Sequence, residues 1–242
     1  MTSSIPAVDT PAGAESAPAL EGVLLDMDGT LVDTEGLWWA AEAAIFAELG
    51  HVLDEADRAV VVGGPMTRSA SYLIETTGAA ITLDALVPLL NARFTELIAG
   101  SVPLMPGARR LLTELTAHGV PTALVSASHR RIIDQVLRSL GPEHFALTVA
   151  GDEVERTKPY PDPYLLAAAG LGADPRRCVV IEDTATGVAA AEAAGCPVLA
   201  VPSVAPIEPA PGRTVAPSLL QVDLAFLRTL ITPREQVGTS IP

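Results

Sequence analysis

The sequence has few basic residues, and lysine is almost absent from it. Its 242 residues include 15 Lys and Arg against 29 Asp and Glu, which gives a formal net charge of -14 at pH 7. Proteins that bind nucleic acids or anionic membranes need a basic surface, so neither partner is expected. Lys158 is the sole lysine. In a chain that otherwise uses arginine for positive charge, this exception indicates a position where a compact, flexible ammonium group is needed.

Cysteines and long apolar runs are also scarce. The two cysteines, Cys178 and Cys196, do not provide a disulfide framework and indicate buried free thiols in a reducing compartment. No apolar run reaches the roughly 18 to 20 residues that a membrane-spanning helix needs. The segment 1–20 has neither the basic region nor the apolar region of a secretory signal. We therefore expect a cytoplasmic protein whose residues 1–20 form a disordered tail.

An apolar run that ends in acidic residues stands near the N-terminus. Residues 23–25 are Val-Leu-Leu, and Asp26, Asp28 and Gly29 follow them. Side chains two residues apart share a face of a strand, so both carboxylates are expected to approach one point at the end of a short buried strand. Two carboxylates this close repel unless a cation lies with them, and Mg²⁺ is the natural cation because it prefers oxygen ligands. Gly29 allows a sharp turn that brings backbone N–H groups near an anion.

Two other interpretations of this run are considered. Asp28-Gly29 is a common turn dipeptide after a strand, with no chemical role. The alternative is an EF-hand calcium loop, in which positions three, five, six and twelve would be Asp26, Asp28, Gly29 and Glu35. Position one of that loop would be Leu24, which offers no side-chain oxygen, and the preceding residues are typical of a strand rather than a helix. The calcium loop therefore fails, whereas the simple turn stays open.

The pattern of apolar residues predicts an α/β protein with an all-helical insertion. After Asp33, apolar residues recur at three-to-four spacing, which is typical of amphipathic helices, and this pattern continues to about residue 102. Strands and helices alternate only after Pro103, and such alternation predicts a doubly wound parallel sheet. Ligands bind such sheets at the carboxyl ends of the strands. The chemical candidates are therefore expected directly after a strand.

Three further groups of polar residues follow predicted strands. Ser126, after an apolar strand and before a helix, offers a hydroxyl and free N–H groups, an arrangement that binds phosphate. Lys158 lies in a segment with three prolines in five residues, which fix its backbone. Glu182 and Asp183 end an apolar, β-branched run, which is typical of a strand buried on both faces. Taken singly, Ser126 and Asp183 are more simply explained as helix caps.

The complete string DxDGTLxDTE, which begins at Asp26, resembles the nucleophile motif of the haloacid dehalogenase (HAD) superfamily. The three later groups follow in the order of that superfamily's other motifs, and the resemblance extends from about Glu21 to Leu230. The length and place of the insertion are similar to the helical cap of the subfamily that contains β-phosphoglucomutase and small sugar-phosphate phosphatases. The resemblance implies a Rossmann-like core of residues 21–33 and 103–232, a helical cap of residues 34–102, a disordered N-terminal tail at 1–20 and a flexible C-terminal tail at 233–242.

This resemblance also implies a role for each polar residue. Asp26 would be the nucleophile that accepts a phosphoryl group, and Asp28 would protonate the leaving alkoxide and then activate water. Mg²⁺ would be held by Asp26, Asp183 and the backbone carbonyl of Asp28. Glu182 would be a further ligand or an outer partner. The residues expected to bind the phosphoryl group are Gly29, Thr30, Ser126, Ala127 and Lys158.

The implied activity is hydrolysis of a small phosphorylated metabolite, in particular a sugar or polyol phosphate, by a monomeric enzyme. Dehalogenases of the superfamily lack an acid at the position of Asp28, and its ion-pumping ATPases have threonine there. A phosphomutase is the main alternative, but the mutase-type cap carries a Lys-Gly pair where residues 61–66 read VVGGPM. A catalytically silent Mg²⁺-binding or interaction module is the second alternative, although the chain keeps every acid and the lysine.

Overall fold

Six parallel β-strands form the centre of the protein. The computed structural model describes residues 19–61, 66–100 and 102–231. The strands are β1 (Gly22–Leu25), β2 (Thr122–Val125), β3 (Leu147–Val149), β4 (Cys178–Glu182), β5 (Val198–Ala200) and β6 (Arg213–Val215). They are hydrogen-bonded in the order β3-β2-β1-β4-β5-β6, and every pair is parallel. The predicted fold class, an α/β protein with a doubly wound parallel sheet, is confirmed.

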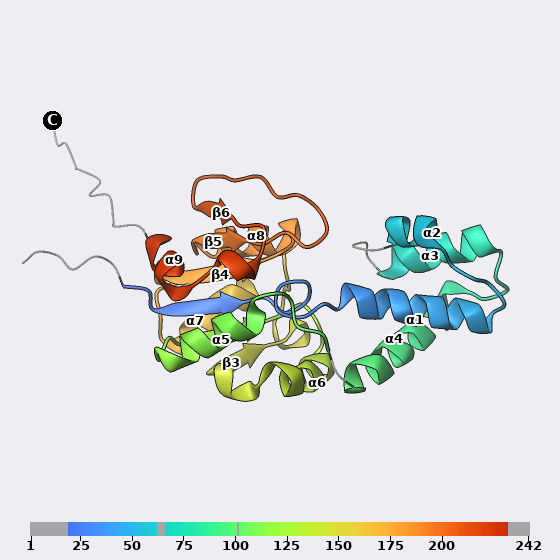
Figure 1. Ribbon diagram of the computed structural model, residues 1–242, viewed down its shortest axis with the longest axis horizontal. Helices are drawn as coiled ribbons and strands as arrows, with labels where there is room; N and C mark the ends of the chain where they lie inside the picture. The colour runs from blue at the N-terminus through green and yellow to red at the C-terminus, as the bar shows by residue number, and fades with distance from the viewer. Residues whose placement is uncertain (1–18, 62–65, 101, 232–242) are drawn as a thin grey trace, which may run out of the picture.

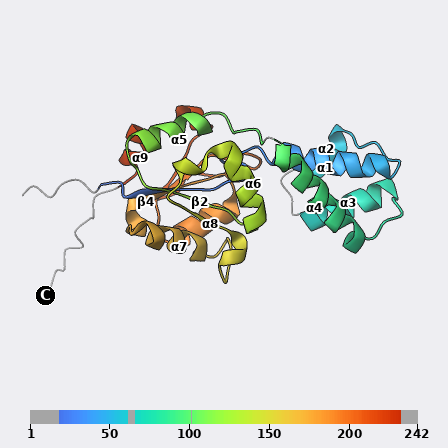
Figure 2. The ribbon, with the colours of Figure 1, turned by 90° about the horizontal axis from the view of Figure 1, so that it is seen from below.

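Helices cover both faces of this sheet. They are α5 (Ala108–Ala117), α6 (Arg130–Leu140), α7 (Asp162–Leu171), α8 (Ala185–Ala193) and α9 (Leu224–Thr229). As Figure 1 and Figure 2 show, α5, α6 and α9 pack on one face, and α7 and α8 pack on the other. Along β1, Val23 and Leu25 belong to the first apolar layer and Leu24 to the second. All four residues of β1 are buried, because neither face of the strand meets solvent.

Four further helices form a helical unit between β1 and α5. They are α1 (Glu35–Glu48), α2 (Glu55–Val61), α3 (Met66–Thr77) and α4 (Leu83–Gly100). The helical unit lies beside the sheet domain, beyond the carboxyl end of β1 (Figure 1). Its own apolar cluster includes Phe46, Leu73 and Leu90. Trp38 stacks on Phe94 with ring centroids 3.9 Å apart, which joins α1 to α4.

Two short segments connect the helical unit to the sheet domain, and they lie side by side. Val32 and Leu104 form an antiparallel bridge. Next to it, the backbone N of Met105 donates to the carbonyl oxygen of Leu31 at 2.9 Å. Because Leu31 follows Asp28 by only three residues, this connection begins at the predicted site. The helical unit is thereby held next to the residues that follow β1.

The sequence pattern does not predict β6 or α9. β6 has three partly buried residues, of which two are polar, so it lacks an apolar run, and α9 has only six residues. The predicted tails at 1–20 and 233–242 lie outside the described residues, apart from residues 19 and 20. The predicted boundaries of the cap stay predictions. Within the described ranges, no helix combines the length and the hydropathy that a membrane span requires.

Gly107 provides a test of how tightly the C-terminal segment packs on α5. Its φ is 93°, and a Cβ there would lie 2.5 Å from the carbonyl carbon of Leu219. We expect Gly107→Ala to lower the free energy of unfolding by about 2 to 5 kcal/mol. The cost of a side chain in the left-handed backbone conformation and the cost of its overlap with Leu219 add together. Gly119→Ala is the control, since Gly119 has a φ of 64° with nothing within 4 Å, and a loss of only about 1 to 2 kcal/mol is expected. Urea unfolding measures both, and equal losses would contradict the close contact with Leu219.

Candidate active site

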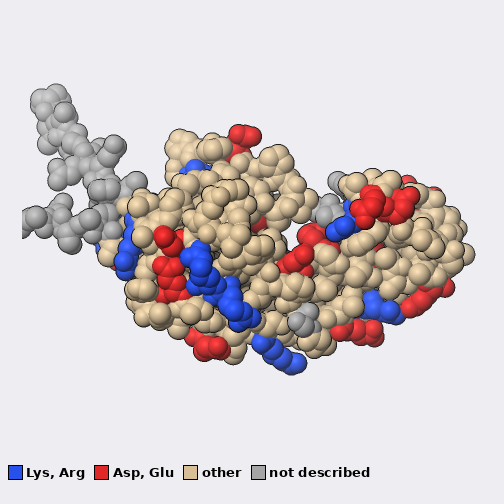
Figure 3. Space-filling model, in the orientation of Figure 1, with Lys and Arg blue, Asp and Glu red and all other residues tan. Residues whose placement is uncertain are grey.

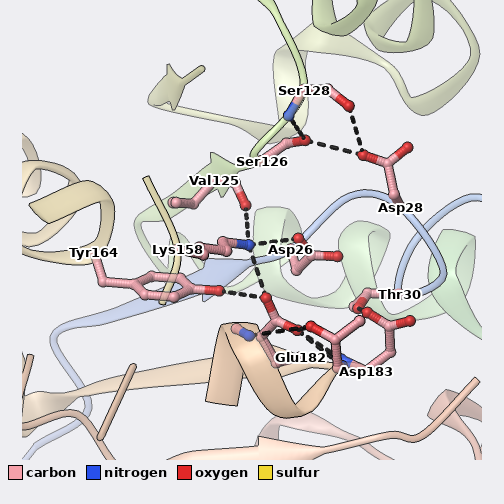
Figure 4. A network of polar contacts seen from close by, with 12 residues as sticks. Asp26, Asp28, Thr30, Val125, Ser126, Ser128, Lys158, Tyr164, Glu182 and Asp183 are labelled. Carbon is pink, nitrogen blue, oxygen red and sulfur yellow. Dashed lines mark hydrogen bonds and ion pairs between the residues drawn. The ribbon is translucent and has the colours of Figure 1, made fainter. Parts of the chain in front are cut away.

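Three buried carboxylates meet at the carboxyl ends of β1 and β4. Asp26 follows β1, Glu182 ends β4 and Asp183 follows it. The parallel register places Leu25 beside Ile181, and the backbone N of Asp26 donates to the carbonyl oxygen of Ile181 at 3.0 Å. One carboxylate oxygen from each of the three acids lies within 4.8 Å of the other two (Figure 4). The structure therefore brings Asp26 together with two acids that lie more than a hundred residues later in the sequence.

Lys158 is the counter-ion of this cluster. Its Nζ lies 2.6 Å from Asp26 Oδ1 and 2.7 Å from Glu182 Oε1, and it donates to the carbonyl oxygen of Val125 at 2.9 Å. Only 5% of the lysine side chain is exposed. Burial alone would lower the pKa of Lys158, but the two carboxylates outweigh it and hold this pKa well above its usual value. The sole lysine is therefore a buried ammonium group with three partners.

One ammonium group does not balance three carboxylates. Burial, followed by the nearby charge of Glu182, raises the pKa of Asp26 well above its ordinary value, and burial raises the pKa of Asp183 to about 6. Asp26 Oδ2 is buried and has no hydrogen-bond partner among the described residues. A buried acceptor is costly unless a donor or a cation meets it. The site therefore has the negative charge and the free oxygen that suit a divalent cation with oxygen ligands.

Both carboxylate oxygens of Glu182 already have partners. Oε1 accepts from Lys158 and, at 3.0 Å, from the hydroxyl of Tyr164. Oε2 accepts from the backbone N of Asp183 and from the backbone N and hydroxyl of Thr184, at 3.0 Å each. Burial would raise the pKa of Glu182, but these partners, Lys158 first, lower it. The sequence leaves two roles open for Glu182: it binds the metal directly, or it orients other residues of the site without binding the metal. These contacts favour the second role, in which Glu182 holds Lys158 in place.

Asp28 faces a different group of residues from Asp26 (Figure 4). Its Oδ2 accepts from the hydroxyls of Ser126 and Ser128 at 3.0 Å each. The backbone N of Ser128 donates to Ser126 Oγ at 2.9 Å, which fixes the loop after β2. The expectation that the two carboxylates approach one point stays a prediction. Their hydrogen-bond partners differ, and β1 ends at Leu25, before both aspartates.

The turn after β1 packs against Asp183. Thr30 donates to Asp183 Oδ1 at 3.1 Å. Gly29 has a φ of 81°, and a Cβ in its place would lie 2.1 Å from Asp183 Oδ2, so a side chain does not fit there. Ala127 lies in the loop after β2 and is exposed. Its backbone packs closely on Gly151, because a Cβ at Gly151 would lie 2.1 Å from the carbonyl oxygen of Ala127. Every residue expected at the site thus lies at the end of β4, in the turns after β1, β2 and β4, or in the loop of Lys158.

Besides Ser128, which donates to Asp28, sequence reasoning missed two polar side chains of the site. Tyr164, in the first turn of α7, is completely buried, and its ring centroid lies 5.0 Å from Lys158 Nζ. Ser203, in the loop after β5, donates to Asp183 Oδ2 at 2.5 Å. β5 ends at the same edge of the sheet as β4, so a polar residue after it is a signal that could have identified Ser203. No comparable signal marks Tyr164, because a tyrosine within a helix is commonly a packing residue.

Comparisons with known proteins find relatives over most of the chain. The family model described as haloacid dehalogenase-like hydrolase matches residues 20–195. The bifunctional riboflavin kinase/FMN phosphatase of Arabidopsis thaliana is 36% identical over 187 residues, which are 75% of this chain but only about half, 48%, of that protein. The fructose-1-phosphate phosphatase YqaB of Escherichia coli (strain K12) is 34% identical over 178 residues, 72% of this chain and 92% of that protein. Among solved structures, a HAD family hydrolase from Deinococcus radiodurans R1 with bound phosphate and sodium is 33% identical to this chain, with a TM-score of 0.71. The match covers 90% of this chain and 100% of that chain.

Tyr164 and Tyr160 offer a matched pair of substitutions. We expect Tyr164→Phe to lower the free energy of unfolding by about 1.5 to 3 kcal/mol, because it removes a buried hydrogen bond to a charged acceptor and keeps the ring. Tyr160 is 50% exposed, so Tyr160→Phe should change this free energy by no more than about 0.5 kcal/mol. Chemical denaturation of both variants measures the difference. Equal losses of unfolding free energy in the two variants would show that the buried hydrogen bond of Tyr164 does not stabilise the protein.

Proposed function

Because the chain belongs to the haloacid dehalogenase-like hydrolase family, we propose that it is a Mg²⁺-dependent phosphatase that hydrolyses a small phosphomonoester through an aspartyl phosphate on Asp26. The observation that carries the proposal is the free Oδ2 of Asp26 in a buried site where Lys158 binds the other oxygen of the same carboxylate. Relatives whose names state a phosphatase activity support it. A carboxylate nucleophile divides one difficult displacement into two easier ones.

The groups that would hold Mg²⁺ are the carboxylates of Asp26 and Asp183 and the backbone carbonyl of Asp28. They are all oxygen donors and two of them are charged, which is the donor set that Mg²⁺ prefers. When bound, Mg²⁺ would neutralise negative charge where the phosphoryl group meets these acids. Glu182, whose oxygens already accept hydrogen bonds, would hold Lys158 in place.

In the first step, one carboxylate oxygen of Asp26 attacks phosphorus, and the bond between phosphorus and the leaving oxygen breaks. Asp28, in its protonated form, gives its proton to the leaving alkoxide. The hydroxyls of Ser126 and Ser128 orient the Asp28 carboxyl group for this transfer. Lys158 offsets the negative charge on the phosphoryl oxygens in the transition state.

In the second step, water attacks the phosphorus of the aspartyl phosphate. Asp28, now ionised, takes a proton from this water, and the bond between Asp26 and phosphorus breaks. Inorganic phosphate leaves, and the carboxylate of Asp26 is restored. Asp28 thus acts as an acid in one half of the reaction and as a base in the other.

We assign the choice of substrate to the helical unit, acting as a cap. Residues 34–102 carry nine acidic residues against three arginines, and Figure 3 shows acidic side chains on the visible face of this unit. Arg58 pairs with Glu55 at 3.6 Å and Arg93 with Glu48 at 2.6 Å, and the third arginine lies outside the described side chains. Such a cap is poorly suited to a second phosphate. It suits a small metabolite with one phosphate, such as a sugar or polyol phosphate.

A phosphomutase is the alternative function. A mutase must hold a second phosphate while its bisphosphate intermediate turns over, and residues 34–102 contain no lysine that could do so. A catalytically silent module is the second alternative, and the retention of Lys158 and of every acid speaks against it. We also propose that the protein is a monomer and that it acts in the cytoplasm.

³¹P NMR with β-glucose 1-phosphate, Mg²⁺ and a trace of the 1,6-bisphosphate distinguishes these functions. We expect inorganic phosphate to accumulate, and we expect EDTA to stop this because Asp26 and Asp183 would then face the phosphate without a cation. Glucose 6-phosphate that appears well ahead of inorganic phosphate would show a mutase. p-Nitrophenyl phosphate is the second substrate, and no Mg²⁺-dependent turnover of either compound would favour the silent module.

Substitution of the two aspartates by asparagine should separate their roles. We expect Asp26→Asn to be folded, inactive and free of a phosphate adduct, because an amide is not a nucleophile. Asp28→Asn should still be phosphorylated by p-nitrophenyl phosphate, whose leaving group needs no proton, while its turnover falls by about 10²- to 10⁴-fold. Intact mass spectrometry of the quenched enzyme detects the adduct, and unfolding curves are the control for folding. An adduct that persists on Asp26→Asn would place the nucleophile elsewhere.

A further inference from the structure

Two hydroxyl groups hold the carboxylate of Asp183, and they come from distant parts of the chain. Thr30, in the turn after β1, donates to Oδ1 at 3.1 Å, and Ser203, in the loop after β5, donates to Oδ2 at 2.5 Å. Asp183 is 4% exposed and Thr30 is 1% exposed. Each oxygen of this buried carboxylate therefore has a partner on the protein.

The sheet brings Ser203 to Asp183. β5 lies next to β4 and runs parallel to it. The backbone N of Val201, directly after β5, donates to the carbonyl oxygen of Glu182 at 2.7 Å, so the two strand ends are joined. Pro202 follows and restricts its own backbone φ. The strand pairing and the proline thus deliver the Ser203 hydroxyl to the acid that follows β4.

The surroundings of Asp183 Oδ2 restrict how this carboxylate can lie. A Cβ at Gly29 would lie 2.1 Å from Asp183 Oδ2 and 2.8 Å from Ser203 Oγ. The backbone of Gly29 and the hydroxyl of Ser203 therefore enclose the same oxygen. A carboxylate oxygen has two lone pairs, so a hydrogen bond from Ser203 occupies one and leaves the other available to a cation.

We infer that Ser203 is a positioning residue for Mg²⁺, whose hydroxyl holds the Asp183 carboxylate in the orientation in which it binds the ion. The inference rests on the proposed function, since it takes Asp183 to be a ligand. Hydrogen-bond partners of metal ligands orient those ligands, and their loss typically costs about 10- to 100-fold in metal affinity or activity. Thr30 holds the other oxygen but shares its turn with Asp28, so Ser203 is the cleaner position to change.

Isothermal titration calorimetry of the folded protein with Mg²⁺ tests this inference without any turnover. We expect Ser203→Ala to raise the dissociation constant for Mg²⁺ by about 10- to 100-fold. Ser203→Thr keeps the hydroxyl and should bind Mg²⁺ nearly as well as the wild type. Ser218→Ala is the matched control, because the hydroxyl of Ser218 accepts from the backbone N of Leu220 at 3.2 Å within its own turn. Its affinity for Mg²⁺ should be unchanged.

Each outcome of the titration is informative. Equal affinities of wild type and Ser203→Ala would overturn the inference and leave the proposed function intact, whereas no binding of Mg²⁺ by the wild type would overturn both. A loss in Ser203→Thr as large as in Ser203→Ala would also contradict the role of the hydroxyl. If circular dichroism shows that Ser203→Ala does not fold, Ser203→Cys replaces it. A thiol is a weaker donor, so weaker Mg²⁺ binding is again expected, and unchanged binding would again overturn the inference.

Discussion

The site depends on an imbalance between one buried ammonium group and three buried carboxylates. Lys158 lies within 2.7 Å of both Asp26 and Glu182, yet neither Asp183 nor the second oxygen of Asp26 has a cationic partner among the described residues. Buried charges are costly unless they are paired. The arrangement therefore favours the binding of further positive charge, and in the proposed mechanism a divalent ion held by Asp26 and Asp183 would supply it. This imbalance of charge thus links the buried lysine, the free oxygen of Asp26 and the proposed need for Mg²⁺.

The parallel sheet makes this concentration of charge possible. β1 and β4 are distant in sequence but pair directly, and the register that sets Leu25 beside Ile181 also sets Asp26 beside the acids that follow. The strands themselves are buried on both faces, so polar side chains collect only where the strands end. Two apolar layers, one under each set of helices, hold these ends in place. The same packing that stabilises the fold also keeps the charges close together.

Much of this arrangement can be predicted from the sequence because it depends on local patterns. The apolar run before Asp26, the prolines around Lys158 and the β-branched run before Glu182 each mark a strand end or a rigid loop. The remainder depends on tertiary contacts. β6 is defined by its pairing with β5, and Ser203 reaches Asp183 through the strand order of the sheet. The role of Glu182 stays open in the sequence because it depends on which donors its two oxygens meet.

Asp26 and Asp28 acquire different surroundings although only one residue separates them. Asp26 extends from the end of β1 into the charged cluster, where Lys158 meets it. Asp28 lies where the chain has already turned, and it accepts from the hydroxyls of Ser126 and Ser128. The proposed mechanism gives the two aspartates different roles, and their different hydrogen-bond partners are consistent with such a division within one short motif. If β1 continued two or three residues further, both side chains would point to the same face of the sheet, and the different surroundings on which the proposed division of roles depends would be lost.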